Sequence, residues 1–490
     1  MKKANHLLWL ITVFIISRCL FFAVGVRFDA SPLEDFLQFI DLPLLKERLL
    51  ESIFFLHSQP PLFNLFLGIM IKIFPQHYAQ AFHGVYLIVG LLFFLSLFSL
   101  MKRLGIRDTL AFWCTVLFMM SPAVILYENW LFYSYPVAAI LCFSALFLHR
   151  FVEKFRFSDG LVFFALLAAL ALIRSVFHLY WFLIILSWLV LSYHQQWKKV
   201  VLTALIPFLC AGLVYLKNFI IFGTFSVSAV FLNAQLAQVT ILGFTDKEIN
   251  ALVQDNKISL LTFKEIGTGF YDIGRYYQEY LDVKLTGIPV LDQHIKSSGY
   301  PNYNSLLSLM TSQYYRDDAL SVLRYDRRGY WRAVKQACQM YFFPGPTDVV
   351  LNNRKWIRDY EDIYYFPFYH LNQLNGRHLY ERLLWHLYGF HQIQWDGISR
   401  VWFFSVVLTY LVVIGFAGYF LIRHSRQGEG PQACCMTLLF ICFNIVYNFI
   451  GHNFLIFLGN NRYRFDVDAF YLVLFAFCLN ALIVKRKPIS

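Results

Sequence analysis

The chain has 490 residues and a formal net charge of +12, and it is 58% hydrophobic but only 15% charged. Soluble globular domains carry about 25% charged residues, so this composition argues against a soluble enzyme and indicates membrane spans. Lys and Arg gather in short clusters beside apolar runs, which is typical of a topology signal and not of a nucleic-acid-binding patch. The nine Cys include no C-x-x-C pair, which argues against a thiolate metal site.

Ten apolar segments are long enough, or nearly so, to cross a bilayer, which takes roughly 20 residues. We interpret the first as a retained span and not as a signal peptide, because it is long and contains Arg18. The two short segments around Arg174 are also compatible with one broken unit. The sequence thus predicts an all-α polytopic membrane protein with about ten transmembrane helices, at 6–26, 79–101, 108–126, 130–149, 160–174, 177–193, 200–222, 400–422, 433–451 and 466–484.

The basic clusters between these segments orient the chain. If the N-terminus is cytoplasmic, alternation places every short Lys and Arg cluster on the cytoplasmic side, as the positive-inside rule requires. We therefore expect both termini to be cytoplasmic. The compact chain without a recognisable retention signal favours a bacterial plasma (inner) membrane. The segments left outside are 27–78, the turn near Glu128, the turn near Arg174, 223–399 and 452–465.

Three parts follow from this topology: a transmembrane module at 1–222, an extracytoplasmic domain at 223–399 and C-terminal helices at 400–490. The outer domain mixes polar and aromatic residues, and we expect it to be mainly helical. The first outer loop, 27–78, contains an apolar stretch at 61–74 that prolines bracket. Because this stretch is too short to span, we expect it to lie in the membrane interface.

The first outer loop is rich in carboxylates. A carboxylate at the membrane surface can take a proton from an acceptor hydroxyl or amine. Simpler readings are open as well, because Asp41 before Leu42-Pro43 has the pattern of a helix N-cap, and the Glu34-Asp35 pair fits a solvated turn. The candidate base is therefore one of four acids: Asp29, Glu34, Asp35 and Asp41.

Other charged residues lie at predicted outer ends of spans. Glu128 shares a side with the first loop, and it is either solvated beside Trp130 or chemically active. Arg174, with His178 four residues later, is bordered by apolar sequence, and such an Arg either snorkels or binds an anion. An outer-leaflet phosphate would be such an anion. Lys217 permits the same two readings.

Arg462 and Arg464 precede the last predicted span, on the outer side, against the positive-inside trend. A lipid phosphate or diphosphate at the head-group level explains an outward Arg pair, so we predict that both bind phosphate, together with the candidates above. The acids and His57 are compatible with a divalent metal, but no ligand spacing requires one, and no other cofactor is indicated.

These features together resemble the GT-C superfamily of membrane glycosyltransferases, which use sugars activated on a polyprenyl phosphate. Within it, the chain is most similar to the protein mannosyltransferases that use dolichyl phosphate mannose and to the bacterial lipid A aminoarabinose transferases. The resemblance covers the order of spans over most of 1–222 and 400–484. Its motifs are the acidic first loop, Gln59-Pro60-Pro61-Leu62, Ser121-Pro122 and Arg462-Tyr463-Arg464-Phe465.

The resemblance implies a hexosyl- or pentosyltransferase in which a first-loop Asp deprotonates the acceptor. The sugar then leaves its lipid phosphate with inversion, while basic residues such as Arg174, Lys217, Arg462 and Arg464 hold that phosphate. A second acid in the next outer loop assists, and Glu128 matches it. Several relatives have an adjacent acidic pair, as in Glu34-Asp35, whereas the distance to the proline pair allows Asp29, and Asp41 stays open.

The resemblance is incomplete before the proline pair. Relatives often have Glu-Lys or His there, whereas this chain has Ser58-Gln59 with His57 further back, which leaves the phosphate or metal role of His57 open. It implies neither the sugar nor the acceptor, which is a protein, a lipid or a glycan.

Two other classes of function compete. A transporter or lipid-linked-sugar flippase is also polytopic, but such proteins tend to carry ionisable groups at mid-membrane and internal repeats. Here the polar residues lie at outer span ends, and no repeat is visible. A non-catalytic scaffold would leave the outward Arg462 and Arg464 unexplained.

Overall fold

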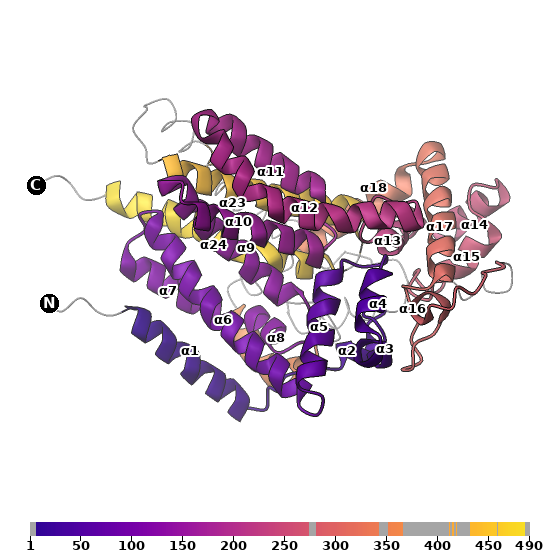
Figure 1. Ribbon diagram of the computed structural model, residues 1–490, viewed down its shortest axis with the longest axis horizontal. Helices are drawn as coiled ribbons and strands as arrows, with labels where there is room; N and C mark the ends of the chain where they lie inside the picture. Colours follow the sequence, from indigo (N-terminus) through magenta and orange to yellow (C-terminus); the bar gives the residue numbers. More distant parts are fainter. Residues whose placement is uncertain are drawn as a thin grey trace, which may run out of the picture.

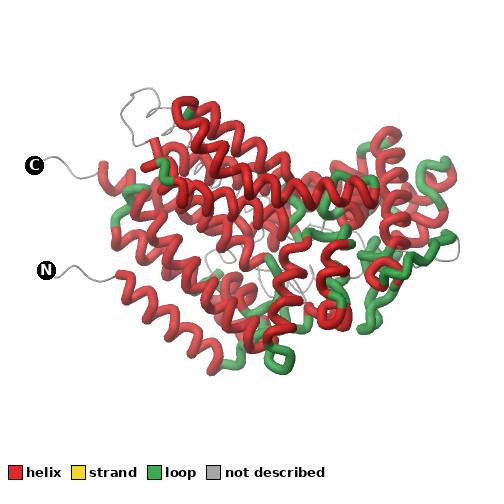
Figure 2. The backbone as a smooth tube through the Cα atoms, viewed as in Figure 1, coloured by secondary structure: helices red, strands yellow, loops and turns green. Residues whose placement is uncertain are grey.

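The computed structural model describes residues 6–273, 281–342, 351–365, 432–457 and 459–485, with isolated positions between 411 and 418. All regular secondary structure in these parts is helical, and Figure 2 shows no strand among them. The expected all-α class is therefore confirmed. The predicted span at 400–422 falls, apart from the isolated positions, outside the described residues.

Six described helices are long and apolar enough to span a membrane, and they make the chain an integral membrane protein. The expected count of about ten spans is not confirmed, because the described residues give six, or seven if one bent pair counts as a span. The six are α1 (His6–Ala23), α6 (Tyr78–Arg103), α9 (Ser134–Lys154), α12 (Trp197–Phe222), α23 (Gln432–Leu455) and α24 (Asn460–Lys485).

The predicted spans at 160–174 and 177–193 correspond to α10 (Phe157–Ile173) and α11 (Leu179–Ser192). Both are apolar, but with 17 and 14 residues they are shorter than the other six. Helix α10 ends just before Arg174, and α11 begins just after His178. The Nδ1 of His178 accepts a hydrogen bond from the Tyr180 amide at 3.4 Å. His178 therefore acts as the N-cap of α11.

The predicted span at 108–126 is broken. It forms α7 (Asp108–Met119) and α8 (Pro122–Glu128), which are bent by 59°. Ser121 caps α8 by accepting a hydrogen bond from the Val124 amide at 3.3 Å, and Pro122 occupies its first turn. Because proline cannot donate a helical hydrogen bond, Ser-Pro starts a new helix here. The bend decides where Glu128 points.

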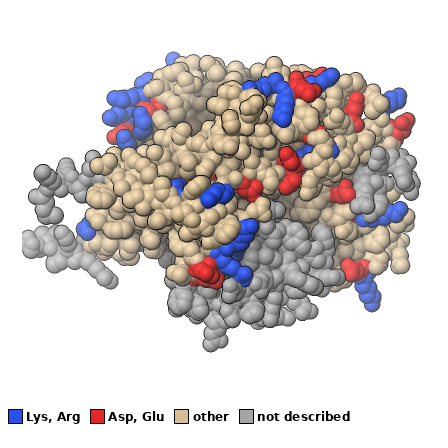
Figure 3. Space-filling model, turned by 90° about the horizontal axis from the view of Figure 1, so that it is seen from below, with Lys and Arg blue, Asp and Glu red and all other residues tan. Residues whose placement is uncertain are grey.

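Helix α9 occupies the centre of the bundle and packs against α6, α10, α23 and α24. The peripheral helices α1 and α12 instead expose apolar residues, among them Ile15, Ile16, Leu20, Leu205, Ile206, Leu209 and Leu213. The start of α1 and the end of α24 lie at one end of the molecule (Figure 1). In Figure 3 a belt of uncharged atoms separates a cluster of charged residues near that end from those on the opposite half. This distribution suits a bilayer around the belt.

The first outer loop folds into short helices: α2 (Pro32–Asp35), α3 (Leu42–Glu47), α4 (Leu49–Phe54) and α5 (Pro61–Ile73). In Figure 1, α4 and α5 run across the direction of α12. They expose apolar side chains, including Leu50, Phe54, Ile69 and Ile73. A crosswise helix of 13 residues with an exposed apolar side is compatible with the expected interfacial position.

The described helices between residues 229 and 341 lie at the end of the molecule away from the start of α1 and the end of α24 (Figure 1), whereas the helix at 354–364 packs against α8. Helices α13 and α17 pack together around a core of their own, and α18 packs against α23 and α24. The helices are α13 (Ala229–Ile241), α14 (Asp246–Gln254), α15 (Leu260–Ile266), α16 (Pro289–Asp292), α17 (Leu306–Tyr325), α18 (Arg328–Tyr341) and α19 (Arg354–Tyr364).

Candidate functional site

Asp29 is the first-loop acid that the backbone holds most firmly. Its amide donates to the Asn129 carbonyl and its carbonyl accepts from the Leu131 amide, both at 2.9 Å. Its half-buried carboxylate accepts from the Ser31 amide at 3.0 Å and from Asn352 Nδ2 at 2.8 Å. Asp29 is thus fixed against the second outer turn, with its carboxylate partly accessible.

The other first-loop acids differ from Asp29. Glu34 and Asp35 are exposed, and their carboxylates form no hydrogen bond or ion pair with another described residue. Asp41 is buried, and its two oxygens accept from the amide and hydroxyl of Ser297 at 2.8 and 2.6 Å. Asp41 does precede α3, but its side chain makes no capping bond. Its carboxylate therefore joins the first loop to the outer segment.

A cavity of about 440 Å³ lies between the first loop and the outer segment. Its lining combines three carboxylates with an ammonium group and two hydroxyls. The lining residues are Glu34, Asp41, Leu42, Pro43, Lys46, Glu47, Ser297 and Ser298.

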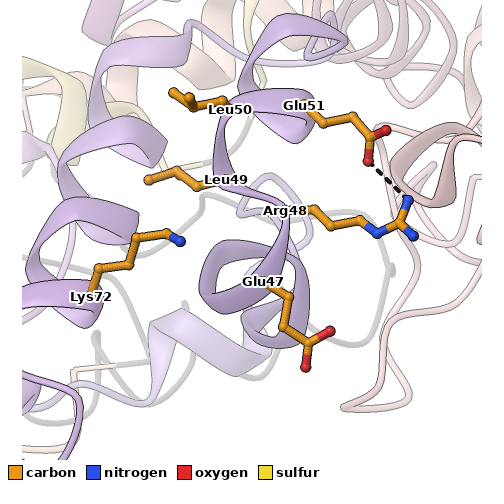
Figure 4. Close-up of a pocket in the computed structure, with 6 residues that line it drawn as sticks. All are labelled: Glu47, Arg48, Leu49, Leu50, Glu51 and Lys72. Carbon is orange, nitrogen blue, oxygen red and sulfur yellow. Dashed lines mark hydrogen bonds and ion pairs between the residues drawn. The ribbon is translucent and has the colours of Figure 1, made fainter.

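A second cavity, of about 600 Å³, lies between α5 and the α3–α4 junction (Figure 4). Lys72 and Leu49 point toward the same space there, whereas Arg48 and Glu51 form an ion pair of 3.2 Å on the opposite side. Glu47 and Leu50 complete the lining. None of the residues that the sequence singled out lines this cavity, so we do not include it in the site.

His57 is fully buried where the first loop meets the outer segment. Its Nδ1 lies 3.2 Å from the Phe55 carbonyl, and its ring centroid lies 4.4 Å from that of Phe222. Burial lowers the pKa of His57 to about 4, so the imidazole is neutral at pH 7. A neutral ring in an apolar contact is a weak partner for phosphate. Among the described residues, no group of three or more His, Cys, Asp and Glu side chains converges as metal ligands would.

The Lys217 side chain also binds backbone groups of the protein itself. Its Nζ donates to the Leu56 carbonyl at 3.0 Å and to the Phe54 carbonyl, at the end of α4. Cations favour helix C-termini, because the last carbonyls lack helical partners. His178 is half-buried and packs its ring against Tyr180 and Tyr215. The structure therefore gives both residues local roles in holding the helices.

Glu128 lies inside the bundle. Its Oε2 and Oε1 bind Arg18 Nη2 and Nε at 2.6 and 2.8 Å, and Tyr135 Oη donates to Oε2 at 2.6 Å. Glu128 is 0% exposed, so the solvated reading is wrong. The neighbouring Trp130 is buried too and is not a belt residue. The bend between α7 and α8 is the reason, because it turns the end of α8 toward Arg18 of α1.

Arg174 is 3% exposed, which excludes snorkelling. Its Nη1 binds Asp466 Oδ1 at 2.8 Å, and its guanidinium lies over the rings of Tyr133 and Tyr463, 5.4 and 4.8 Å from their centroids. Its Nη2 is buried without a hydrogen-bond partner among the described residues. An unsatisfied guanidinium N–H is a position that an anionic oxygen could fill.

The two arginines of the last motif have different surroundings. Arg464 is buried, and it binds Asp468 Oδ1 and the Tyr341 carbonyl at 2.9 Å each. Arg462 is half-buried and lies over the Phe132 ring, 5.1 Å from its centroid. Residues two apart on a helix point about 200° apart, so the two side chains cannot share one ligand face. Arg462 is the more exposed of the two and is therefore the more accessible to a ligand.

Aromatic rings connect Asp29 with Arg462. Asp29 forms a backbone bridge with Trp130, whose ring centroid lies 4.6 Å from that of Phe132. Phe132 in turn lies beneath Arg462. Phe36 of the first loop contacts both rings, at 5.4 Å from Trp130 and 5.0 Å from Phe132. The structure therefore brings one predicted acid and one predicted cation to the two ends of the same aromatic cluster.

Sequence reasoning missed several residues that define these sites. Arg18 was used only as an argument against a signal peptide, although a buried Arg usually has a buried acid as its partner. Lys296, Ser297 and Asn352 lie in a segment without a recognisable motif, and they reach the first loop from more than 250 positions away. No pattern in the neighbouring sequence predicts contacts between residues so far apart in the chain.

Comparison with known proteins does not identify the chain. It matches no protein-family profile, no curated protein and no solved structure. The function is therefore inferred from the residues and their geometry.

Proposed function

We propose that the chain is a membrane glycosyltransferase of the GT-C type, which moves a sugar from a polyprenyl phosphate to an acceptor on the extracytoplasmic face. The surroundings of Tyr463 carry this proposal. Arg174 and Arg462 both lie over its ring, and Asp466 pairs with Arg174. The buried, unpartnered Nη2 of Arg174 adds a donor for an anionic oxygen. A lipid-linked phosphate has the charge and the membrane location to meet these groups.

Asp29 is the acid that we propose as the base. A carboxylate has about four lone-pair positions, so the two hydrogen bonds that orient Asp29 leave room for an acceptor proton. Asp41 and Glu128 are buried, with both oxygens engaged. Glu34 and Asp35 are exposed, and no described partner orients them. A base is effective when it is both accessible and oriented, which favours Asp29.

The reaction is a single displacement. Asp29 takes the proton of an acceptor hydroxyl or amine while that atom attacks the anomeric carbon of the sugar. The bond from this carbon to the phosphate oxygen breaks, and the electron pair leaves with the polyprenyl phosphate. Arg462 and Arg174 stabilise the charge on that phosphate. One displacement inverts the anomeric centre, which the stereochemistry of the product would reveal.

The test uses the purified full chain in nanodiscs, supplied with a panel of polyprenyl-phosphate sugars and candidate acceptors, and it measures release of polyprenyl phosphate. We expect Asp29→Asn to reduce release at least 100-fold, because general base catalysis contributes about 10²–10⁴-fold. Asp35→Asn is the matched control and should retain release. Full release in Asp29→Asn, Glu34→Gln, Asp35→Asn and Asp41→Asn alike would rule out a first-loop base.

A transporter or lipid-linked-sugar flippase is the second candidate. The broken pair α7 and α8 favours it, as do the buried ion pairs Arg18–Glu128 and Arg174–Asp466, because transporters use interrupted helices and buried ionisable groups. Translocation of a polyprenyl-phosphate sugar across proteoliposomes, without any transfer of the sugar, would support it over the glycosyltransferase.

A further inference from the structure

The outer segment carries a small hairpin at 295–301. Ile295 and Pro301 form an antiparallel bridge, and the Lys296 amide donates to the Tyr300 carbonyl at 2.8 Å. The Gly299 amide closes the turn by donating to the Lys296 carbonyl at 2.9 Å. Gly299 has φ +85°, which a side chain would strain. The four residues Lys296–Gly299 form the hairpin tip.

Three consecutive residues of the hairpin tip donate hydrogen bonds to three residues of the first loop. The bonds run from Lys296 Nζ to the Phe36 carbonyl, from Ser297 N and Oγ to the Asp41 carboxylate at 2.8 and 2.6 Å, and from Ser298 Oγ to the Glu34 carbonyl at 2.9 Å.

These contacts are stronger than those of an ordinary surface turn. Lys296 is 4% exposed, and burial lowers the pKa of its amine to about 8, although the Asp41 and Asp35 carboxylates act in the opposite direction. Hydrogen bonds to an ionised carboxylate, such as those from Ser297, are about twice as strong as neutral ones. Ser297 and Ser298 are themselves exposed. None of the four tip residues belongs to the core between α13 and α17.

We propose that the hairpin tip is a latch and that Lys296 and Ser297 are positioning residues for the first loop. Lys296 holds the backbone of Phe36, whose ring packs on the Trp130–Phe132 pair that joins Asp29 to Arg462. When closed, the latch keeps this aromatic cluster in place. When it opens, it frees Phe36 and widens the cavity of about 440 Å³ between the hairpin tip and α3, through which an acceptor reaches the loop. The role in the reaction rests on the proposed function, whereas the latch itself does not.

Hydrogen–deuterium exchange on the full chain in nanodiscs tests the latch without any donor. Exchange under native conditions reports local opening. We expect segments 31–41 and 295–301 to share one opening rate, faster than that of α17. We expect Ser297→Ala to raise exchange in both segments about tenfold or more, because it removes a hydrogen bond to a charged group. Ser297→Thr keeps the hydroxyl and should restore the slow exchange, which a general loss of structure would not allow.

The chain offers a matched control in Ser259, whose amide and hydroxyl donate to Asp318 at 3.1 and 2.7 Å within the outer segment. Ser259→Ala should raise exchange near α15 and leave 31–41 unchanged. The latch is refuted if Ser297→Ala changes 295–301 alone, or if both segments exchange as slowly as α17. A refuted latch leaves the glycosyltransferase proposal intact, and absence of sugar transfer leaves a confirmed latch intact.

Discussion

The buried ion pair between Arg18 and Glu128 gives the sharpest test of how the spanning helices hold together. Helix α1 lies at the edge of the bundle and buries only Leu10, Phe14 and Ser17. Its charged contact with α8 therefore carries a large share of its attachment. Glu128→Gln removes the charge and leaves the Arg18 guanidinium, 10% exposed, without a counterion. The same change tests the role of Glu128, because loss of a purely catalytic acid would leave stability unchanged.

The magnitude follows from the burial of the pair. Removing one partner of a buried ion pair costs about 3–5 kcal/mol, whereas replacing both partners with apolar groups of similar volume is close to neutral. We expect Glu128→Gln to cost about 3 kcal/mol. We expect the triple variant Arg18→Met, Glu128→Met, Tyr135→Phe to lie within about 1 kcal/mol of the original chain. Tyr135→Phe is included because its hydroxyl donates to Glu128.

Reversible unfolding in mixed micelles, followed by circular dichroism, provides the free energies. The matched control is Glu153→Gln, which breaks an ion pair of 3.1 Å with Arg103 whose side chains are 42% and 39% exposed. Exposed pairs contribute about 0–1 kcal/mol, so this variant should barely change stability. Equal costs for Glu128→Gln and Glu153→Gln would show that the reasoning from burial is wrong.

Gly90→Ala should destabilise the chain by about 1–3 kcal/mol in the same assay, because a Cβ there would lie 2.5 Å from Tyr135 Oη and 2.8 Å from Glu128 Oε2. Gly84→Ala, on the same helix with nothing within 4 Å, should be neutral or stabilising. Burial holds the pKa of His57 at about 4 against 6.5, so the unfolded chain binds the proton first as the pH falls. Stability is then complete above about pH 6.5 and is lost toward pH 4, by on the order of 3 kcal/mol. His57→Phe should remove this loss, and an unchanged pH profile would contradict it. A fluorescent protein fused after Ser490 should fluoresce in the cytoplasm, whereas active alkaline phosphatase at that position would contradict the predicted topology.

The class of the protein was predictable from the sequence because the bilayer imposes a local requirement. A run of about 20 apolar residues must be helical to satisfy its backbone in hydrocarbon, so composition and segment length are enough. The same counting identified α5 as too short to span. It failed to foresee the bend at Ser121-Pro122, because a proline inside an apolar run is compatible with either a kinked span or a new helix.

The partners of the charged residues were decided by the tertiary structure. Glu128 was predicted at the surface, yet it pairs with Arg18 from 110 positions away, and Arg174 pairs with Asp466 across 292 positions. The first-loop acids look alike in the sequence, yet Asp41 binds Ser297, Asp29 binds Asn352, and Asp35 makes no such contact. Side-chain periodicity shows which residues face the bundle, but it carries no information about the residue opposite. The choice between a structural ion pair and an accessible acid therefore depends on the packing of segments far apart in the chain.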